Sequence, residues 1–249
     1  MKKVKVGKHI LEIYDSIDEL PVLRFHKYNK MLLIDSGVGS DLNDVNNHVE
    51  RAMIYLKTNP DLAIKELDNL RQAMFLIMSE VSPNHLAFCT LVKSIDGKPF
   101  DDLSDEGLKE MLVKIKDISH TEITAQMEAV KKKIDNELNL YFPSSFEDVT
   151  IKEYFDQLKK RTILVLDSII TGESKEREIQ KITELLITYT KPHSFNGSNS
   201  VEIKHDKEFE DMCLLLSEKL HIDPKKFTVL EYYNAFEYLK KKLKWKKTP

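Results

Sequence analysis

The chain has 249 residues, of which 41% are hydrophobic and 32% are charged, with only 7 glycines and 8 prolines. That hydrophobic fraction can build a packed core, so the composition excludes a globally disordered chain, and the scarcity of Gly and Pro argues against a turn-rich β architecture. The net charge is −3, but residues 240–247 carry six lysines and no acid, so the remainder carries −9. The sequence therefore predicts an acidic body with a basic tail.

Targeting signals and cysteine chemistry are equally restricted. No apolar segment follows Met1-Lys2-Lys3, and no uninterrupted apolar run approaches the ~18 residues of a membrane span, so neither a secretory signal nor a membrane span is expected. The two cysteines, Cys89 and Cys213, form no CxxC pair and are interpreted as buried thiols in a reducing compartment. These features predict cytoplasmic residence.

The chain begins with alternating apolar and polar residues. Their spacing over 2–14 predicts a β-hairpin, which should dock on helices or pair with another copy because an isolated hairpin is marginally stable. Ser16 and Glu19 then match a capping box ahead of a proline and predict a helix that ends at Ser36-Gly37. A strand over 22–25 is the alternative.

Two amphipathic helices are predicted next. Ser40 caps the first, and Asn59-Pro60 opens the second. Apolar residues recur at spacings of three and four in both helices, which predicts a core-facing stripe on each. The stripes are Leu42, Val45, Val49, Ala52 and Leu56 on the first helix, and Ala63, Leu67, Leu70, Met74, Ile77 and Val81 on the second.

A central, buried helix is predicted over 83–92, where the sequence is apolar almost all round, and residues 96–99 are expected to form a turn. Ser104 caps a short helix that reaches about residue 116. A longer helix follows, and Pro143-Ser144-Ser145 is the predicted domain boundary. The inward face of the longer helix is Ile123, Met127, Val130, Ile134, Leu138 and Tyr141.

The second part of the chain holds about four helices by the same rules. The first runs over 151–171, the stretch 191–204 is the least structured, and Asp223-Pro224 separates the last two. Matching Thr–Glu capping boxes at 150–153 and 228–231 start the first and the last of these helices. The side chains expected to face inward on the first are Phe155, Leu158, Val165 and Ile169.

Together these elements predict an all-α multi-helix bundle with a small N-terminal β-hairpin. Residues 1–16 form the hairpin arm, and 17–142 form an N-terminal helical domain. Residues 146–249 form a C-terminal helical domain, with a loop at 191–204 and the basic tail at 240–249.

Motifs for catalysis or cofactor binding are weak. A GxG stands ahead of a helix at 35–40, but no GxxxxGK[ST] and no third glycine accompany it, and two helix caps explain it. His205 and Asp206, with His193 twelve residues before His205, suggest a metal site, although Asp206 is better explained as the cap of the next helix. No catalytic, cofactor-binding or metal-binding residue is assigned, and we expect a chain that is not an enzyme.

The end of the chain holds the residues predicted to contact a partner. Lysines alternate with aromatic and apolar side chains, a composition that suits nucleic acid, an anionic membrane surface or an acidic protein. A last helical turn whose lysines complement the helix dipole is the alternative. The predicted partner-binding residues are Tyr232, Tyr233, Lys240, Lys241, Lys242, Lys244, Trp245, Lys246 and Lys247.

Three longer stretches carry a resemblance. They are residues 20–41 (LPVLRFHKYNKMLLIDSGVGSD), 85–108 (HLAFCTLVKSIDGKPFDDLSDEGL) and 227–240 (FTVLEYYNAFEYLK). These stretches resemble uncharacterised virion structural and assembly proteins of tailed bacteriophages that infect Bacteroides-like bacteria. The resemblance implies a part of the particle, or a chaperone for its tail or head-tail junction, located in the host cytoplasm or the virion. None of the stretches is a catalytic motif, so no functional residue is transferred.

The preferred hypothesis is a non-enzymatic, protein-interaction component of tailed-phage morphogenesis. It would be a head-tail connector, a tail subunit or a tail assembly chaperone, and it would bind other phage structural proteins or copies of itself as a homo-oligomer. The alternative is a nucleic-acid-binding helical module that uses the basic tail. A third hypothesis is a metal-dependent helical hydrolase built around His193, His205 and Asp206.

Overall fold

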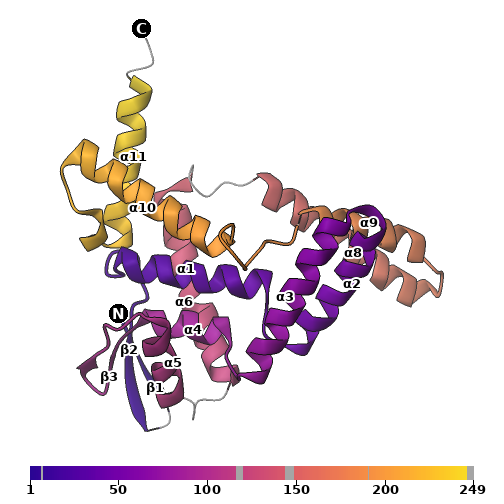
Figure 1. The fold of residues 1–249 in the computed structure, drawn as a ribbon, viewed down its shortest axis with the longest axis horizontal. Helices are drawn as coiled ribbons and strands as arrows, with labels where there is room; N and C mark the ends of the chain where they lie inside the picture. Colours follow the sequence, from indigo (N-terminus) through magenta and orange to yellow (C-terminus); the bar gives the residue numbers. More distant parts are fainter. Residues whose placement is uncertain (7, 116–119, 144–148, 190, 246–249) are drawn as a thin grey trace.

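A computed structural model describes residues 1–6, 8–115, 120–143, 149–189 and 191–245. The chain is mainly helical, with a small antiparallel sheet at its N-terminal end, which confirms the predicted fold class (Figure 1). The strands are β1 (Lys2–Val6), β2 (His9–Ile13), β3 (Val92–Ile95) and β4 (Lys98–Pro99). The helices are α1 (Val22–Gly37), α2 (Leu42–Thr58), α3 (Pro60–Met78), α4 (Pro83–Leu91), α5 (Asp105–Lys114), α6 (His120–Tyr141), α8 (Val149–Thr171), α9 (Glu176–Tyr189), α10 (Val201–Leu220), the 3-10 helix η1 (Pro224–Lys226) and α11 (Val229–Trp245).

The sheet is larger than the sequence predicted. Strands β1 and β2 form the expected hairpin, with Lys2 opposite Ile13. Strand β2 also pairs with β3, and β3 with β4, all antiparallel, in the order β1-β2-β3-β4. The predicted helix over 83–92 ends at Leu91, and the chain continues as β3, in which Val92 and Ser94 point inward. The hairpin thus gains a third strand from its own chain, which an isolated hairpin needs for stability.

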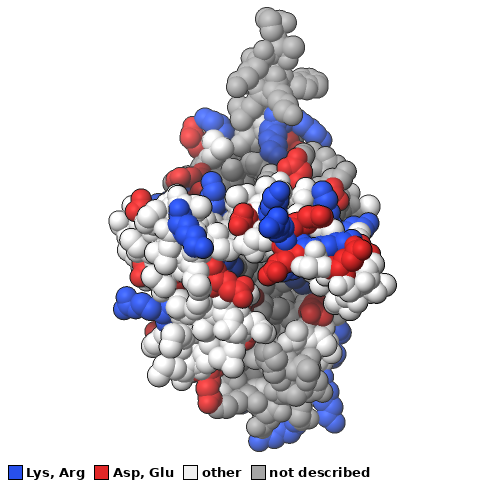
Figure 2. All heavy atoms as spheres, turned by 90° about the vertical axis from the view of Figure 1, so that its right-hand side faces the viewer, with Lys and Arg blue, Asp and Glu red and all other residues white. Residues whose placement is uncertain are grey.

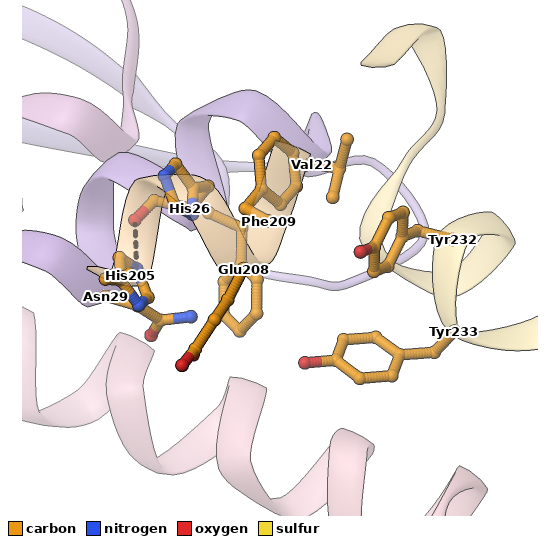
Figure 3. A pocket seen from close by; sticks show the side chains of 9 residues that line it. Val22, His26, Asn29, His205, Glu208, Phe209, Tyr232 and Tyr233 are labelled. Carbon is orange, nitrogen blue, oxygen red and sulfur yellow. Dashed lines mark hydrogen bonds between the residues drawn. The ribbon is translucent and has the colours of Figure 1, made fainter. Parts of the chain in front are cut away.

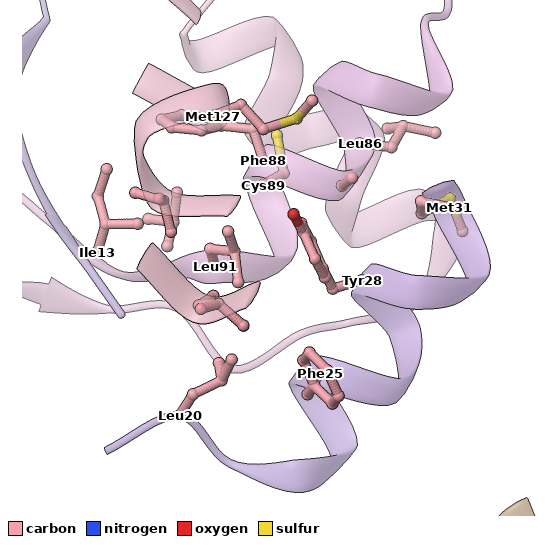
Figure 4. Close-up of a cluster of buried hydrophobic side chains, with 14 of the residues drawn as sticks. Ile13, Leu20, Phe25, Tyr28, Met31, Leu86, Phe88, Cys89, Leu91 and Met127 are labelled. Carbon is pink, nitrogen blue, oxygen red and sulfur yellow. The ribbon is translucent and has the colours of Figure 1, made fainter. Parts of the chain in front are cut away.

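The main core lies between this sheet and helices α1, α4, α5 and α6 (Figure 4). Leu11 and Ile13 of β2 and Phe88 of α4 are fully buried in it. The predicted inward face of α6 is confirmed from Ile123 to Leu138. Its last member is wrong, because Tyr141 is exposed and its neighbour Phe142 is buried instead.

A buried arginine ties α1 to the sheet. Arg24 donates hydrogen bonds to the carbonyl oxygens of Thr90 (3.0 Å) and Val92 (2.9 Å) and to that of Phe100. These carbonyls lie where the chain leaves α4 and where it leaves β4. One guanidinium therefore supplies hydrogen-bond donors to carbonyl groups at the ends of these elements. The thiols of Cys89 and Cys213 are also buried, as predicted.

The C-terminal helices pack on α1. The Val22 amide donates to the Phe227 carbonyl, and the Val229 amide donates to the Leu20 carbonyl, each at 2.9 Å. The capping box at the start of α11 is confirmed: the Thr228 amide donates to Glu231 Oε2 at 2.9 Å, and the Glu231 amide donates to Thr228 Oγ1 at 3.3 Å. The domain boundary at Pro143-Ser144-Ser145 stays a prediction, since 144–148 lie outside the described residues.

Two other predictions about the helices are wrong: the cap ahead of α1 and part of the inward face of α8. Helix α1 begins after Pro21 without a side-chain cap, because Ser16 instead donates its hydroxyl to Glu137 Oε2 at 2.8 Å. On α8, Phe155 and Ile169 do not face inward but are largely exposed. In contrast, the Ser104 cap of α5 is confirmed by a bond of 3.0 Å from the Gly107 amide to Ser104 Oγ.

Candidate protein-interaction surface

Helices α2 and α3 form an antiparallel hairpin that leans away from the sheet-containing body (Figure 1). Its caps are local. Asp41 and Asp44 form a capping box that starts α2, and the Asn59 side chain accepts from the Leu62 amide at the start of α3. Ser40, the predicted cap of α2, is not the cap, because its amide donates to Asp44 Oδ2 at 2.8 Å. That carboxylate also accepts from the Asp41 amide at 3.0 Å, so the two amide groups that follow the GxG turn are already paired with a side chain of this chain.

A buried polar cluster joins the two helices of the hairpin. Glu66 of α3 is fully buried and accepts from Arg51 Nε at 2.8 Å. Its other oxygen lies 2.7 Å from His48 Nδ1, and His48 Nε2 donates to the Val38 carbonyl at 2.7 Å. The small side chains of Ala52 and its counterparts on α3 allow the backbones to approach around this cluster. The cluster therefore fixes how α2 and α3 are rotated against each other.

One outer face of the hairpin is covered by later parts of the chain. The Tyr55 hydroxyl donates to the Ile187 carbonyl of α9 at 3.0 Å, and Asn69 Nδ2 donates to the His193 carbonyl at 3.1 Å. Phe195 packs on Ala73. Its ring also lies so close to Gly37 that a Cβ atom added to Gly37 would stand 2.4 Å from the Phe195 ring. Helix α9 and residues 191–200 thus cover this side of α2 and α3.

The opposite face of the hairpin is apolar and exposed, and we call it the hairpin face. Met78 is 82% exposed, Leu42 is 72% exposed and Phe75 is 69% exposed. Such fractions are high for large apolar side chains that are neighbours on one surface. The hairpin face comprises Leu42, Val49, Met53 and Leu56 of α2, and Ile64, Leu67, Met74, Phe75 and Met78 of α3.

The hairpin face corrects the predicted core stripes of these helices. The buried row on α2 contains His48, Ala52 and Tyr55, and that on α3 contains Ala63, Glu66, Asn69 and Ala73. Ala52 and Ala63, which belong to the predicted stripes, are buried as expected. The other members of each buried row lie one residue before a predicted position, a rotation of about 100° on a helix. Leu42, Val49, Leu56, Leu67 and Met74 were predicted to face the core and are instead exposed.

Both exposed rows lie on the same side of the hairpin. On α2, Met53 follows buried Ala52, and on α3, Ile64 follows buried Ala63. The same rotation in two antiparallel helices that pack on each other turns both rows toward one side. The row on α2 is Leu42, Asn46, Val49, Met53 and Leu56, and the row on α3 is Ile64, Leu67, Arg71, Met74 and Met78. Both rows alternate steps of three and four residues, which is the spacing of a coiled-coil seam.

The hairpin face is large enough for a specific interface. With about 200 Å² for each fully exposed side chain of this size, the nine exposed fractions leave on the order of 1,000 Å² of side-chain surface in water. Specific protein–protein interfaces bury about 800 Å² per partner, and most monomers expose apolar patches of only about 300–600 Å². The size of the patch therefore indicates a protein-binding surface.

Charge does not gather into a single-sign patch on the side of the molecule drawn in Figure 2. Lys and Arg alternate there with Asp and Glu, and uncharged areas separate them. On this side, a mixed surface of this kind gives little long-range attraction for a polyanion.

A second feature is an aromatic pocket of about 190 Å³ between α1, α10 and α11 (Figure 3). The His26 ring stacks between those of His205 and Phe209, at centroid distances of 4.4 and 4.2 Å. Tyr232 and Tyr233, two predicted partner-binding residues, line the same pocket. Tyr232 is buried and Tyr233 is half-buried, so both also pack the interior, and their partner-binding role stays a prediction.

Ion pairs surround this pocket. Asp206 accepts from Lys30 Nζ at 2.6 Å and lies 2.9 Å from His26 Nε2. Partial burial raises the pKa of Asp206, but the bonds from Lys30 and His26 outweigh it and lower the pKa below its ordinary value. Burial lowers the pKa of His26, with the Asp206 carboxylate opposing the shift. The predicted role of Asp206 as a helix cap is wrong, because Ser200 caps α10.

The three residues of the metal-site hypothesis, His193, His205 and Asp206, do not point toward one common site. His193 and His205 line one cavity of about 880 Å³, whereas Asp206 points to Lys30 and His26 of α1. Among the described residues, no three His, Cys, Asp or Glu side chains gather at metal-binding distances. Over the same residues, no helix is both long and apolar enough to cross a bilayer.

The basic tail continues α11 as a helix up to Trp245, which includes Lys244. Lys240 pairs with Glu237 at 3.0 Å and lies 4.3 Å from the Phe236 ring centroid. Lys241 and Lys242 are exposed, and Lys246 and Lys247 lie outside the described residues.

Comparison with models of known families, with curated proteins and with solved structures found no match to this chain.

Proposed function

We propose that this chain is a non-enzymatic, protein-binding component of tailed-phage morphogenesis, acting as a head-tail connector or tail subunit or as a tail assembly chaperone. The phage context rests on the resemblance carried by residues 20–41, 85–108 and 227–240. The protein-binding role rests on the hairpin face, which is the observation that carries the proposal.

The hairpin face has the chemistry of a helix-binding surface. Two rows with three- and four-residue steps let the side chains of a partner helix insert between them as knobs into holes. Met53, Met74 and Met78 contribute flexible, polarisable side chains that adapt to an apolar partner. Covering the face removes apolar surface from water, which supplies the driving force for association.

A genetic complementation experiment tests the proposal. A phage that carries an amber codon in this gene is grown in a host that does not suppress it, and particles are examined by electron microscopy. We expect heads without complete tails. A supplied copy with Leu67→Glu should fail to restore particles, because it places a charge in the hairpin face.

Val113→Glu is the matched control, since Val113 of α5 is 70% exposed and lies outside the hairpin face. This copy should restore complete particles. Normal particle yield without the protein would contradict the proposal as a whole. Restoration by Leu67→Glu would contradict the role of the hairpin face.

A second candidate function is nucleic-acid binding by the basic tail. The observation that favours it is that α11 projects away from the body with Lys241 and Lys242 exposed near its end (Figure 1). Binding of this kind weakens steeply with salt because counterions are released from the phosphates. A chain truncated before Lys240 should then elute from a DNA column at lower salt than the full chain. Equal elution would exclude this function.

A further inference from the structure

The two rows of the hairpin face each contain one polar residue among apolar ones. On α2 it is Asn46, and on α3 it is Arg71, whose side chain is 84% exposed. A polar residue within an otherwise apolar seam restricts which partner fits, because it needs a polar neighbour in the same layer. The position of these two residues therefore says what kind of partner covers the face.

The register of the hairpin places the two polar residues at the same height. His48 lies opposite Glu66, and Tyr55 packs with Ala63 at the tip of the hairpin. In an antiparallel pair, each step along one helix is a step back along the other. The contacts of Glu66 with His48 and of Ala63 with Tyr55 place the level of Asn46 between residues 68 and 72 of α3, and Arg71 is the member of the exposed row within that span.

The apolar residues match in height in the same way. By that register, Val49 is level with Leu67, Met53 is level with Ile64, and Leu42 is level with Phe75. From Leu42 to Met53, each apolar residue of the row on α2 thus has an apolar counterpart on α3, whereas Leu56 and Met78 lie at the two ends of the hairpin face without one. Between Leu42 and Met53, the one polar layer contains Asn46 and Arg71.

We propose that a second copy of this chain covers the hairpin face, with the two hairpins related by a two-fold axis parallel to the helices. This inference deepens the proposed function and rests on it. A rotation about such an axis leaves the height of each residue unchanged and places α2 of one copy on α3 of the other. All neighbouring helices are then antiparallel, as in a four-helix bundle.

The four layers from Leu42 to Met53 are matched across this interface. Asn46 faces the partner's Arg71, so its side-chain carbonyl accepts from the guanidinium and neither polar group is left unpaired in an apolar surrounding. Val49 faces the partner's Leu67, and Met53 faces the partner's Ile64. The face covers on the order of 1,000 Å² on each copy, above the roughly 800 Å² per partner of a stable complex.

A perpendicular two-fold axis fits less well. An axis that lies in the plane of the interface, perpendicular to the helices, places α2 of one copy on α2 of the other, and α3 on α3, with each pair running in opposite directions. If the axis passes at the height of Val49, Asn46 meets Met53 of the other copy. If it passes at the height of Asn46, the two Arg71 side chains meet and repel each other. The parallel axis avoids both mismatches.

Light scattering on the full chain after size-exclusion chromatography gives the first test. We expect a particle of twice the chain mass of 29.0 kDa. Leu67→Glu should weaken the dimer by roughly 100-fold or more, since it buries two charges in apolar layers. Asn46→Lys should weaken it by about tenfold or more, because the introduced ammonium group would face the partner's Arg71. Val113→Glu should leave it unchanged. Far-UV circular dichroism confirms that each variant is folded.

Cysteine cross-linking tests the axis. Tagged chains with Met53→Cys are mixed with untagged chains with Ile64→Cys under mild oxidation, and the native thiols are buried. A disulfide should form between the two variants and not within either sample alone. Dimers without this disulfide would overturn the parallel axis.

A chain that is monomeric at all concentrations would overturn the second copy as the occupant. If such a monomer still requires Leu67 in the complementation experiment, a different protein covers the face and the proposed function stands. If Leu67→Glu also restores particles, both proposals fail.

Discussion

The strongest stability prediction concerns Glu66, the buried carboxylate that joins α2 to α3. Replacing it with Gln keeps its shape but removes its charge. The bond of 2.8 Å from Arg51 Nε and the contact of 2.7 Å with His48 Nδ1 lose their ionic character, which makes up about half of their strength. One oxygen also becomes an amide NH2 group, which cannot accept the second bond from Arg51 (Nη2, 3.3 Å). The expected loss is about 2–3 kcal/mol of unfolding free energy.

Glu66→Ala should cost more, about 3–5 kcal/mol, because Arg51 and His48 then lose their buried partner altogether. The assay is urea unfolding followed by far-UV circular dichroism, in which 2–3 kcal/mol lowers the midpoint by about 1 M. Glu50→Gln, an exposed change on the same hairpin, is the control and should stay within about 0.5 kcal/mol. If Glu66→Gln unfolds at the wild-type midpoint, the cluster does not hold the hairpin together.

Three further predictions concern single side chains: Arg24, Thr228 and Asp35. Arg24→Met leaves three backbone carbonyls without their donor and should cost about 2–4 kcal/mol in the same unfolding assay, and a wild-type midpoint would contradict the buried geometry. Thr228→Ala removes one half of a capping box and should cost about 1 kcal/mol, measured as a lower melting temperature. Burial, with the charges of Asp44 and Asp41, raises the pKa of Asp35 to about 6, above its unfolded value of about 3.9. The protonated carboxyl therefore favours folding below about pH 4, and this contribution is lost as pH rises through 6. Asp35→Asn should then raise stability by about 1–2 kcal/mol at pH 8 and by little at pH 4, and an equal effect at both pH values would contradict the shift.

Much of the fold could be predicted from local pattern. Periods of two and of three to four residues, together with caps such as Ser104 and Thr228, depend only on neighbours in sequence, and they placed most helices correctly. Strand β3 could not be predicted, because Val92 ends the apolar run of the preceding helix and residues 93–95 are too few to show strand alternation. Only the pairing with β2 makes these residues a strand. The cap at Ser16 failed because a distant residue, Glu137, competes for its hydroxyl.

The hairpin face could not be located from the sequence because the apolar row on α2 and on α3 lies one residue away from the row that is buried, which is partly polar. The row with the larger side chains, such as Leu67 and Met74, gave the stronger amphipathic signal and was assigned to the core. The row that packs contains Glu66 and the small residue Ala73, because a small side chain allows close approach around the buried cluster, and it shares only Ala63 with the predicted stripe. The alternation of small and polar residues at helical spacing, Ala63, Glu66, Asn69 and Ala73, is a signal that could have revealed this.

The most direct test of a covered hairpin face is the oxidation rate of its methionines, read by mass spectrometry after a brief peroxide pulse. Met53 and Met74 should oxidise as fast as exposed Met1 in dilute protein, and buried Met31 should stay protected throughout. We predict that both hairpin-face methionines become protected as protein concentration rises, and that Leu67→Glu abolishes this protection. Rates that stay fast at every concentration, and equal in wild type and Leu67→Glu, would contradict self-association through this face.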